Sequence, residues 1–181
     1  SDEDGGNDGV GGHSIVAMTE GAMTELGVFD GDTISIKGKR GRRTVATVAM
    51  VSDANAAAMG GHNHGGDDSI LDGCLSLGMS QDTMKNAGVR AGDAVKVTPA
   101  PDVKFGKNVL ILPFADSLAS AGAETGEEAN VFEDYLRPYF EAKFRTLARG
   151  DSFRVDGPLG VLEFQCVEID TVEVDGDSAC V

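Results

Sequence analysis

The chain has 181 residues, of which 41% are hydrophobic and 6% aromatic, and it contains no Trp. Its 30 acidic and 15 basic residues give a formal net charge of −15, which argues against a large nucleic-acid interface and against docking on an anionic membrane, because both depend on Lys and Arg. A core built mainly from Val, Ile, Leu and Ala fits one large domain or two small ones.

The chain opens on an acidic, glycine-rich segment, residues 1–12, which predicts a disordered leader or a remnant of cloning. No signal peptide is visible, and no apolar run approaches the roughly 18 residues that span a bilayer. The three cysteines lie far apart without a CxxC pair, so we expect a reducing, intracellular compartment rather than a disulfide framework or a zinc site. Residues 14–18 are predicted to form the first strand.

An internal repeat follows, in which residues 22–36 (AMTELGVFDGDTISI) match residues 83–97 (TMKNAGVRAGDAVKV) at a constant offset of 61 positions. Each copy predicts a short helical turn, a Gly-Asp turn and an alternating strand. Glycine permits positive φ, and the carboxylates of Asp32 and Asp93 are expected to accept backbone N–H groups that close the turn. A weaker third turn of this kind stands at Gly150-Asp151. Two turns in register favour a pseudo-symmetric β-barrel over a chance similarity of two loops.

Hairpin, loop and helix signals separate the two copies. The basic run 37–43 predicts a solvated hairpin rather than a phosphate-binding patch, and the Val- and Thr-rich run 44–51 predicts the strand that follows. Residues 54–69, rich in Gly, Asn and Asp, predict a flexible surface loop. Ser80 is expected to N-cap a short helix that runs to Gly88.

Pro99 and Pro101 mark a boundary, because proline cannot continue a ladder of strand hydrogen bonds. The chain therefore divides into two β-rich modules, 13–101 and 102–181, and the expected fold class is mainly β with short helices. Residues 131–140 fit a short helix or a strand. Alternating patterns in the second module predict strands at residues 108–112, 153–155, 160–168 and 171–174.

The sequence contains no recognisable catalytic constellation. It lacks the GxxxxGK[ST] loop that cradles nucleotide phosphates, and no nucleophile stands with a positioned base, so we expect a non-catalytic chain. A loop pair, His62 and His64, with nearby Asp67 and Asp68, offers donors that zinc accepts. A Gly-rich loop provides no rigid surroundings to hold such ligands, so no metal site is predicted.

Longer motifs stand at Phe29-Asp30-Gly31-Asp32-Thr33, at residues 101–107 (PDVKFGK), at residues 135–140 (YLRPYF) and from Gly150-Asp151 to Glu163-Phe164. In this order and spacing they resemble the amino-terminal domain of the valosin-containing protein family, also called transitional endoplasmic reticulum ATPases, which are hexameric AAA unfoldases. The resemblance extends from about residue 14 to the end. It implies a double-ψ β-barrel followed by a smaller four-stranded β-barrel, monomeric when isolated. ATP and Mg²⁺ are implied only for the ATPase domains of a hexameric parent.

The resemblance also implies a docking cleft between the barrels, which receives UBX-type adaptors, arginine-rich helical motifs and other cofactors of the ubiquitin pathway. Carried over by motif position, the cleft is lined by Ile15, Phe29, Asp32, Ala49, Val51, Lys104, Phe105 and Phe144. A second face, directed toward the ATPase ring, is implied at Arg90, Asp156 and Gly160. Neither nucleic acid nor direct membrane insertion is expected.

The chain departs from the family pattern at both faces. Arginines of the family are replaced by Asp30, Asp156 and Gly160, and tyrosines by Phe105 and Phe144. These changes indicate a divergent relative with a narrowed or shifted adaptor repertoire. The family implies cytoplasm or nucleus, and protein import into complex plastids is one setting for such divergence. The alternative is a free-standing ubiquitin-binding adaptor of the ubiquitin-fusion-degradation type with the same pair of barrels.

Overall fold

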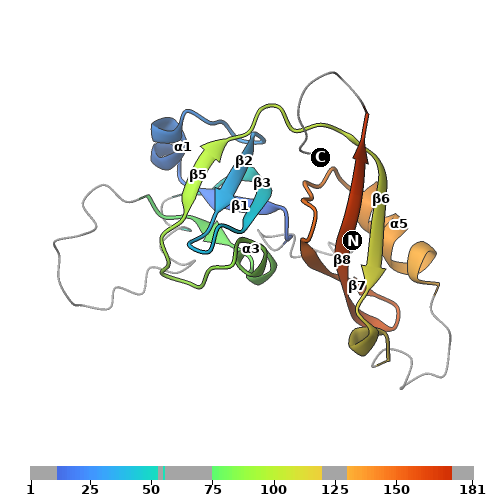
Figure 1. The fold of residues 1–181 in the computed structure, drawn as a ribbon. Helices are drawn as coiled ribbons and strands as arrows, with labels where there is room; N and C mark the ends of the chain where they lie inside the picture. The colour runs from blue at the N-terminus through green and yellow to red at the C-terminus, as the bar shows by residue number, and fades with distance from the viewer. Residues whose placement is uncertain (1–11, 53–54, 56–74, 120–129, 173–181) are drawn as a thin grey trace, which may run out of the picture.

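The computed structural model describes residues 12–52, 55, 75–119 and 130–172. It is a mixed α and β structure, made mainly of strands with a few short helices, which confirms the expected class. Figure 1 shows two sheets side by side, joined by the segment between β5 (Lys96–Pro99) and β6 (Gly106–Pro113). The predicted leader up to residue 11, the loop at 54–69 except Asn55, and residues 173–174 of the last predicted strand lie outside the described residues.

The first module is built on a five-stranded sheet in the order β4-β1-β3-β2-β5. Besides β5, its strands are β1 (Ile15–Met18), β2 (Thr33–Lys37), β3 (Arg43–Met50) and β4 (Gly78–Met79). The β1–β3 pair is parallel and the other neighbours are antiparallel. Strands were therefore predicted at the right places for β1, β2 and β3.

The two repeat copies fold into matching units. Their helices, α1 (Glu20–Leu26) and α3 (Gln81–Ala87), are N-capped by Thr19 and Ser80, and both end at a glycine with φ of 68°. Ser80 accepts a hydrogen bond from the backbone N–H of Thr83 at 3.1 Å, as predicted. The same sequence pattern thus produces the same helix and the same caps twice.

The strands of the two copies pair with each other. Within the antiparallel β2–β5 ladder, Ile36 lies opposite Val97, and these residues are equivalent in the repeat. A local twofold axis therefore passes through this pair, and Ile34 falls opposite Pro99 on one side of it. The second strand begins only at Lys96, later than the offset predicts.

All three Gly-Asp turns share one geometry. An N–H three residues earlier in the chain donates to the carboxylate, at 2.8 Å for Asp32, 3.0 Å for Asp93 and 2.9 Å for Asp151. The preceding glycines have φ of 89°, 85° and 90°, in the left-handed region that favours glycine. The turn that the sequence marked as weaker is therefore as complete as the other two.

The second module contains an antiparallel sheet in the order β6-β8-β7, with β7 at Ser152–Gly157 and β8 at Gly160–Thr171. The stretch at 131–140 is helical: a π-helix, η1 (Phe132–Leu136), continues into α5 (Arg137–Glu141). A separate strand beginning at Thr171 is wrong, because β8 runs unbroken for 12 residues and ends there. Within the described residues the sheet has three strands, not the four of the expected barrel.

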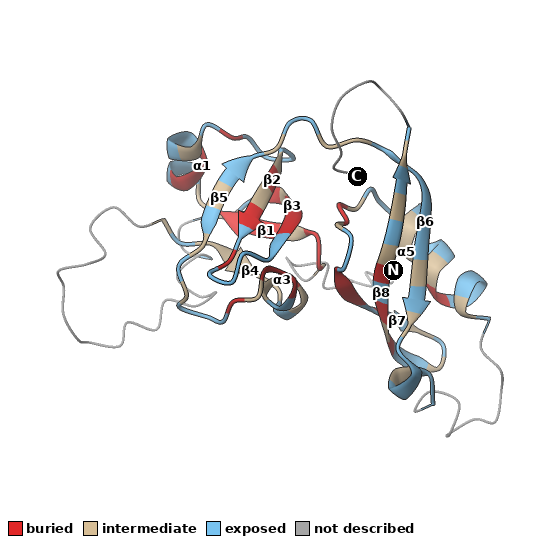
Figure 2. Ribbon diagram, viewed as in Figure 1, coloured by how far each residue is buried: buried red, intermediate tan, exposed pale blue. Residues whose placement is uncertain are grey.

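Each module has its own hydrophobic core, visible as the red segments of Figure 2. The first core gathers residues from β1, β2, β3, α1 and α3, among them Val16, Ile34 and Val48. The second gathers aromatic and aliphatic residues around Tyr135, Phe153 and Phe164. None of the helices in the described ranges is long and apolar enough to cross a membrane.

Candidate functional site

Phe29 is presented on the first Gly-Asp turn. Its ring is 76% exposed, while its backbone N–H and C=O are both bonded to Asp32. The turn is also fixed to β3, because the N–H of Gly31 donates to the carbonyl of Val48 at 2.9 Å and the N–H of Met50 donates to Asp30 at 2.7 Å. An exposed phenylalanine on a fixed backbone is a pre-organised contact residue.

Ile15 and Ala49 share the sheet face opposite the first core. The parallel register places Ile15 beside Thr47 and Ala17 beside Ala49. Ile15 and Ala49 are half-buried, whereas Val16 and Val48 between them point into the core. Val51, also half-buried, continues β3 beyond its end and donates its N–H to the carbonyl of Met18 at 2.9 Å.

The second module contributes an aromatic pair. Phe105 is 64% exposed and Phe144 is 85% exposed, and their ring centroids lie 6.1 Å apart in an edge-on arrangement. Lys104, next to Phe105, is half-buried. Among the described residues, no ring contact joins Phe29 to this pair.

The residues predicted to face an ATPase ring are also distributed over both modules. Arg90 is exposed on the second Gly-Asp turn, where its N–H donates to Asp93. Asp156 and Gly160 belong to the β7–β8 hairpin, and Gly160 has a φ of 96°. In the described part of the chain, no hydrogen bond or ion pair joins Arg90 to the hairpin pair.

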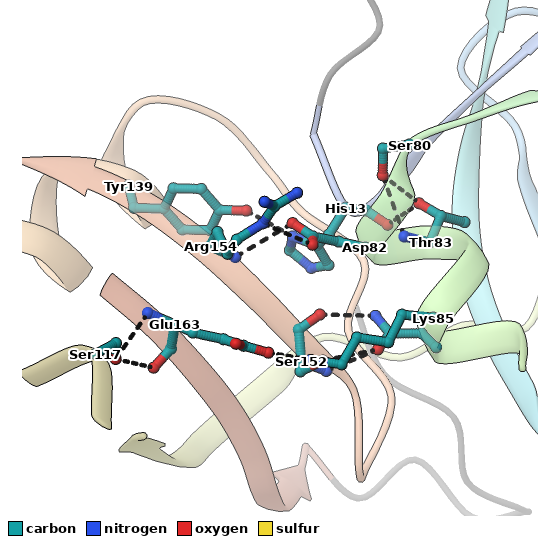
Figure 3. A network of polar contacts seen from close by, with 11 residues as sticks. His13, Ser80, Asp82, Thr83, Lys85, Ser117, Tyr139, Ser152, Arg154 and Glu163 are labelled. Carbon is teal, nitrogen blue, oxygen red and sulfur yellow. Dashed lines mark hydrogen bonds and ion pairs between the residues drawn. The ribbon is translucent and has the colours of Figure 1, made fainter. Parts of the chain in front are cut away.

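The two modules meet along a polar seam, which we define as the contacts of α3, β3 and His13 with residues 139–163. The side-chain amide of Asn86 donates to the carbonyl of Ser152 at 2.9 Å and accepts from the N–H of Ser152 at 2.8 Å. Thr44 donates to Asp151 at 2.8 Å. Figure 3 shows further pairs pointing across the seam: Arg154 with Asp82 at 2.9 Å, and Lys85 with Glu163.

His13 fills the interior of the seam. Its imidazole stacks at 4.8 Å from Phe153 and 5.9 Å from Tyr139, measured between centroids. Nδ1 lies 2.5 Å from the hydroxyl of Tyr139 and Nε2 lies 3.2 Å from the carbonyl of Thr146. Burial, with a smaller contribution from the Arg145 guanidinium, lowers the pKa of His13 to about 4. The ring is therefore neutral at pH 7, with Nδ1 accepting from Tyr139 and Nε2 donating to Thr146.

Asp151 is the second buried titratable group of the seam. It accepts hydrogen bonds from Thr44 and from the N–H of Ala148, which favour the carboxylate. Burial outweighs these bonds and the charge of Arg42, and raises the pKa of Asp151 to about 6. The carboxylate of the third Gly-Asp turn thus closes its own turn and also binds β3 through Thr44.

Sequence reasoning missed the seam residues, because isolated Thr, Asn and Ser usually lie at the surface. One signal was available. The repeat places Asn86 where the first copy has Glu25, and Glu25 is exposed while Asn86 is buried. A polar residue that breaks the repeat on one helix face marks the face that contacts the other module.

The described residues contain no group of three or more His, Cys, Asp or Glu side chains that could hold a metal ion. The donors considered in the loop, His62, His64, Asp67 and Asp68, lie outside those residues. In a comparison with models of known protein families, none matches this chain.

Proposed function

We propose that the chain is an adaptor-docking module of a hexameric AAA unfoldase, with a double-ψ barrel as its first half and a four-stranded barrel as its second. The repeat supports the first barrel, because two equal helix–turn–strand units related by a local twofold axis are what a pseudo-symmetric barrel requires. The antiparallel three-stranded sheet supplies most of the second. Ubiquitin-pathway adaptors are the proposed partners.

The exposure of three phenylalanines carries this proposal. Phe29, Phe105 and Phe144 are 76%, 64% and 85% exposed. Large apolar rings left in water on a fixed backbone are typical of residues that a partner covers, and aromatic anchors contribute much of the affinity at such interfaces. These rings come from both modules, as an inter-module docking site requires.

Charge supports the choice of partner. The carboxylates of Asp30 and Asp32 flank Phe29, and each accepts one backbone N–H, which leaves oxygen lone pairs available. The chain as a whole carries a net charge of −15. Both features favour an arginine-bearing partner, through local hydrogen bonds and through long-range attraction that raises the association rate.

Titration calorimetry tests the docking proposal with two ligands, a UBX domain and an arginine-rich helical peptide. We expect binding of at least one, and we expect Phe105→Ser to weaken it about tenfold, as the loss of an aromatic anchor does. The matched control is Phe132→Ser, which removes a phenylalanine that is 59% exposed on η1, outside the predicted cleft. It should leave affinity within about twofold. Absence of heat with both ligands would refute conventional adaptor docking.

The link to an unfoldase has its own test. Reading the coding sequence beyond Val181 for Walker A and Walker B motifs checks whether ATPase domains follow. A stop codon at that point, together with binding of free ubiquitin, would replace the unfoldase assignment with the free-standing ubiquitin-binding adaptor.

A further inference from the structure

A cavity of about 640 Å³ opens beside the seam, between the segment leading into β1 and the residues around η1, α5 and β7. Its apolar lining includes Ile15, Pro138 and the ring of Tyr139. Three cationic side chains, Lys143, Arg145 and Arg154, line the same space. In a chain with a net charge of −15, three cations around one cavity are a strong local departure from the surroundings.

Arg145 is held in place through its Nε and through the face of its guanidinium. Its Nε donates to the carbonyl of Tyr139 at 2.9 Å, and its guanidinium lies over the Tyr139 ring at 3.7 Å from the centroid. Beyond these contacts, its two terminal nitrogens donate to no described residue. A planar guanidinium fixed by one nitrogen and by stacking is pre-organised to bind an oxyanion through the others.

Arg154 is oriented in a similar way. Its Nε donates to Asp82 at 2.9 Å, and its backbone N–H donates to the other oxygen of the same carboxylate at 3.3 Å. The Asp82 side chain is only 15% exposed, so this contact fixes Arg154 from the side of the first module. The cavity therefore has cationic groups positioned from both modules.

We propose that this cavity binds an anionic group, a carboxylate or a phosphate, carried by a small ligand, with Arg145 as the main contact. Tyr139, Pro138 and Ile15 would pack against the apolar part of the ligand. This inference goes beyond adaptor docking, since it uses none of the three exposed phenylalanines and shares only Ile15 with the predicted cleft.

Asp156 allows the charge of the ligand to be tested. Its carboxylate also lines the cavity, and it makes no ion pair with a described residue. For an anionic ligand this charge is repulsive, so its removal should strengthen binding. For a cationic or neutral ligand, removal should weaken binding or leave it unchanged.

The experiment titrates the full chain at constant ionic strength with pyrophosphate in one arm and citrate in the other, followed by calorimetry. We expect saturable binding in at least one arm, about tenfold weaker affinity in Arg145→Gln and about threefold stronger affinity in Asp156→Asn. The arm with the tighter affinity assigns a phosphate or a carboxylate. Lys107→Gln, at an exposed position of β6, should bind as the wild type does.

Absence of saturable heat in both arms would overturn the proposal. So would equal affinity in Arg145→Gln and the wild type, or weaker binding in Asp156→Asn. If Arg145→Gln has lost its circular dichroism spectrum, the exposed Asp156→Asn substitution decides alone, because it touches no structural contact. Neither result bears on adaptor docking, which is measured with protein and peptide ligands at other residues.

Discussion

The imidazole of His13 is 2% exposed and accepts its hydrogen bond from Tyr139 only while it is neutral. Since its pKa is lowered from 6.5 to about 4, the unfolded chain binds a proton more tightly than the folded chain does. The stability that neutral His13 provides is complete above pH 6.5 and is lost as the pH falls toward 4. Asp151 acts in the opposite direction. Its pKa is raised to about 6, so the folded state gains stability as the pH falls below that value and loses it as the pH rises through 6.

Replacing His13 by Gln should remove the loss of stability that His13 causes on acidification. Between pH 7 and pH 5, the contribution of His13 to the free energy of unfolding falls by about 2 kcal/mol. On acidification over this interval, His13→Gln should therefore lose about 2 kcal/mol less stability than the wild type. Urea unfolding followed by circular dichroism at both pH values measures it. The control is His62→Gln combined with His64→Gln, the only other histidines of the chain. An unchanged pH dependence in His13→Gln would contradict the assignment.

Asp151→Asn should remove the gain of stability that Asp151 provides on acidification. The acid-driven gain from this carboxyl is about 1 kcal/mol between pH 7 and pH 5, so the variant should lose more stability than the wild type over the same interval. Asn keeps an oxygen that accepts from Thr44, which limits disturbance of the turn. Asp156→Asn, an exposed aspartate, is the matched control. If Asp151→Asn lost less stability on acidification than the wild type, the raised pKa would be wrong.

Among the elements, the β2–β3 hairpin packs directly against the end of α3. Gly38 is buried there, and a Cβ at this position would overlap the carbonyl oxygen of Ala87 and lie 2.7 Å from Cγ1 of Val89. At the hairpin tip, Lys39 pairs with Asp93 of the second repeat at 3.0 Å. The basic run at 37–43 is thus only partly the solvated hairpin that its charge predicts, because Gly38 packs against Ala87 and Val89 of the second repeat copy.

Gly38→Ala should destabilise the first module strongly, by about 3 kcal/mol, because the added methyl meets backbone that cannot move aside. Gly41→Ala is the matched substitution in the same hairpin. There φ is 76° and no atom lies within 4 Å of the new methyl, so only backbone strain of about 1 kcal/mol is expected. Unfolding midpoints in urea measure both, and equal losses would show that the close approach at Gly38 does not exist.

Local sequence patterns were sufficient to predict the helix caps and turns of the repeat units. The Ser80 cap and the Gly-Asp turns were predicted because their signals lie within a few residues of one another. The range 131–140 stayed open, since its mixed apolar pattern has no clear period, and its helical state depends on Tyr135 packing in the second core. The unbroken length of β8 was missed because its pairing with β6 continues across the break in the pattern at Asp170.

The candidate sites show the same division. Motif position placed Phe29, Phe105 and Phe144 at exposed sites, although their docking role stays a prediction. The cationic cavity was not predicted, because Arg154 is oriented by Asp82, which is distant in sequence, and because no sequence pattern marks the contact of Arg145 with Tyr139. Contacts between distant single residues leave no periodic pattern to read.

Across the whole molecule, the modules are joined largely by hydrogen bonds rather than by a shared apolar core. The two hydrophobic clusters have no residue in common, and the seam between them consists of Asn86, Thr44, Asp151 and their partners, with His13 stacked inside. All buried polar side-chain atoms of the described residues have a hydrogen-bond partner. Such an interface fixes one arrangement closely, because any shift leaves buried groups unpaired.

Asn86→Ala should therefore weaken the joint more than its size suggests. It leaves the N–H and C=O of Ser152 without partners, at a cost of about 3 kcal/mol. Lys85→Ala, one residue earlier, removes the partly exposed ion pair with Glu163 and the contact of the ammonium with the Phe114 ring, and should cost about 1 kcal/mol. Hydrogen exchange should rise at residues 151–153 in Asn86→Ala alone. Similar exchange in the two variants would contradict a seam held by Asn86.

The distribution of tyrosine has a practical consequence for optical work on this chain. Tyr135 and Tyr139 are its only tyrosines, it has no Trp, and both rings belong to the second module. Tyrosine emission of the unlabelled protein therefore originates entirely from one half of the molecule. It reports on that half selectively, and comparing this signal with circular dichroism, to which both halves contribute, distinguishes separate melting from joint melting without any introduced probe.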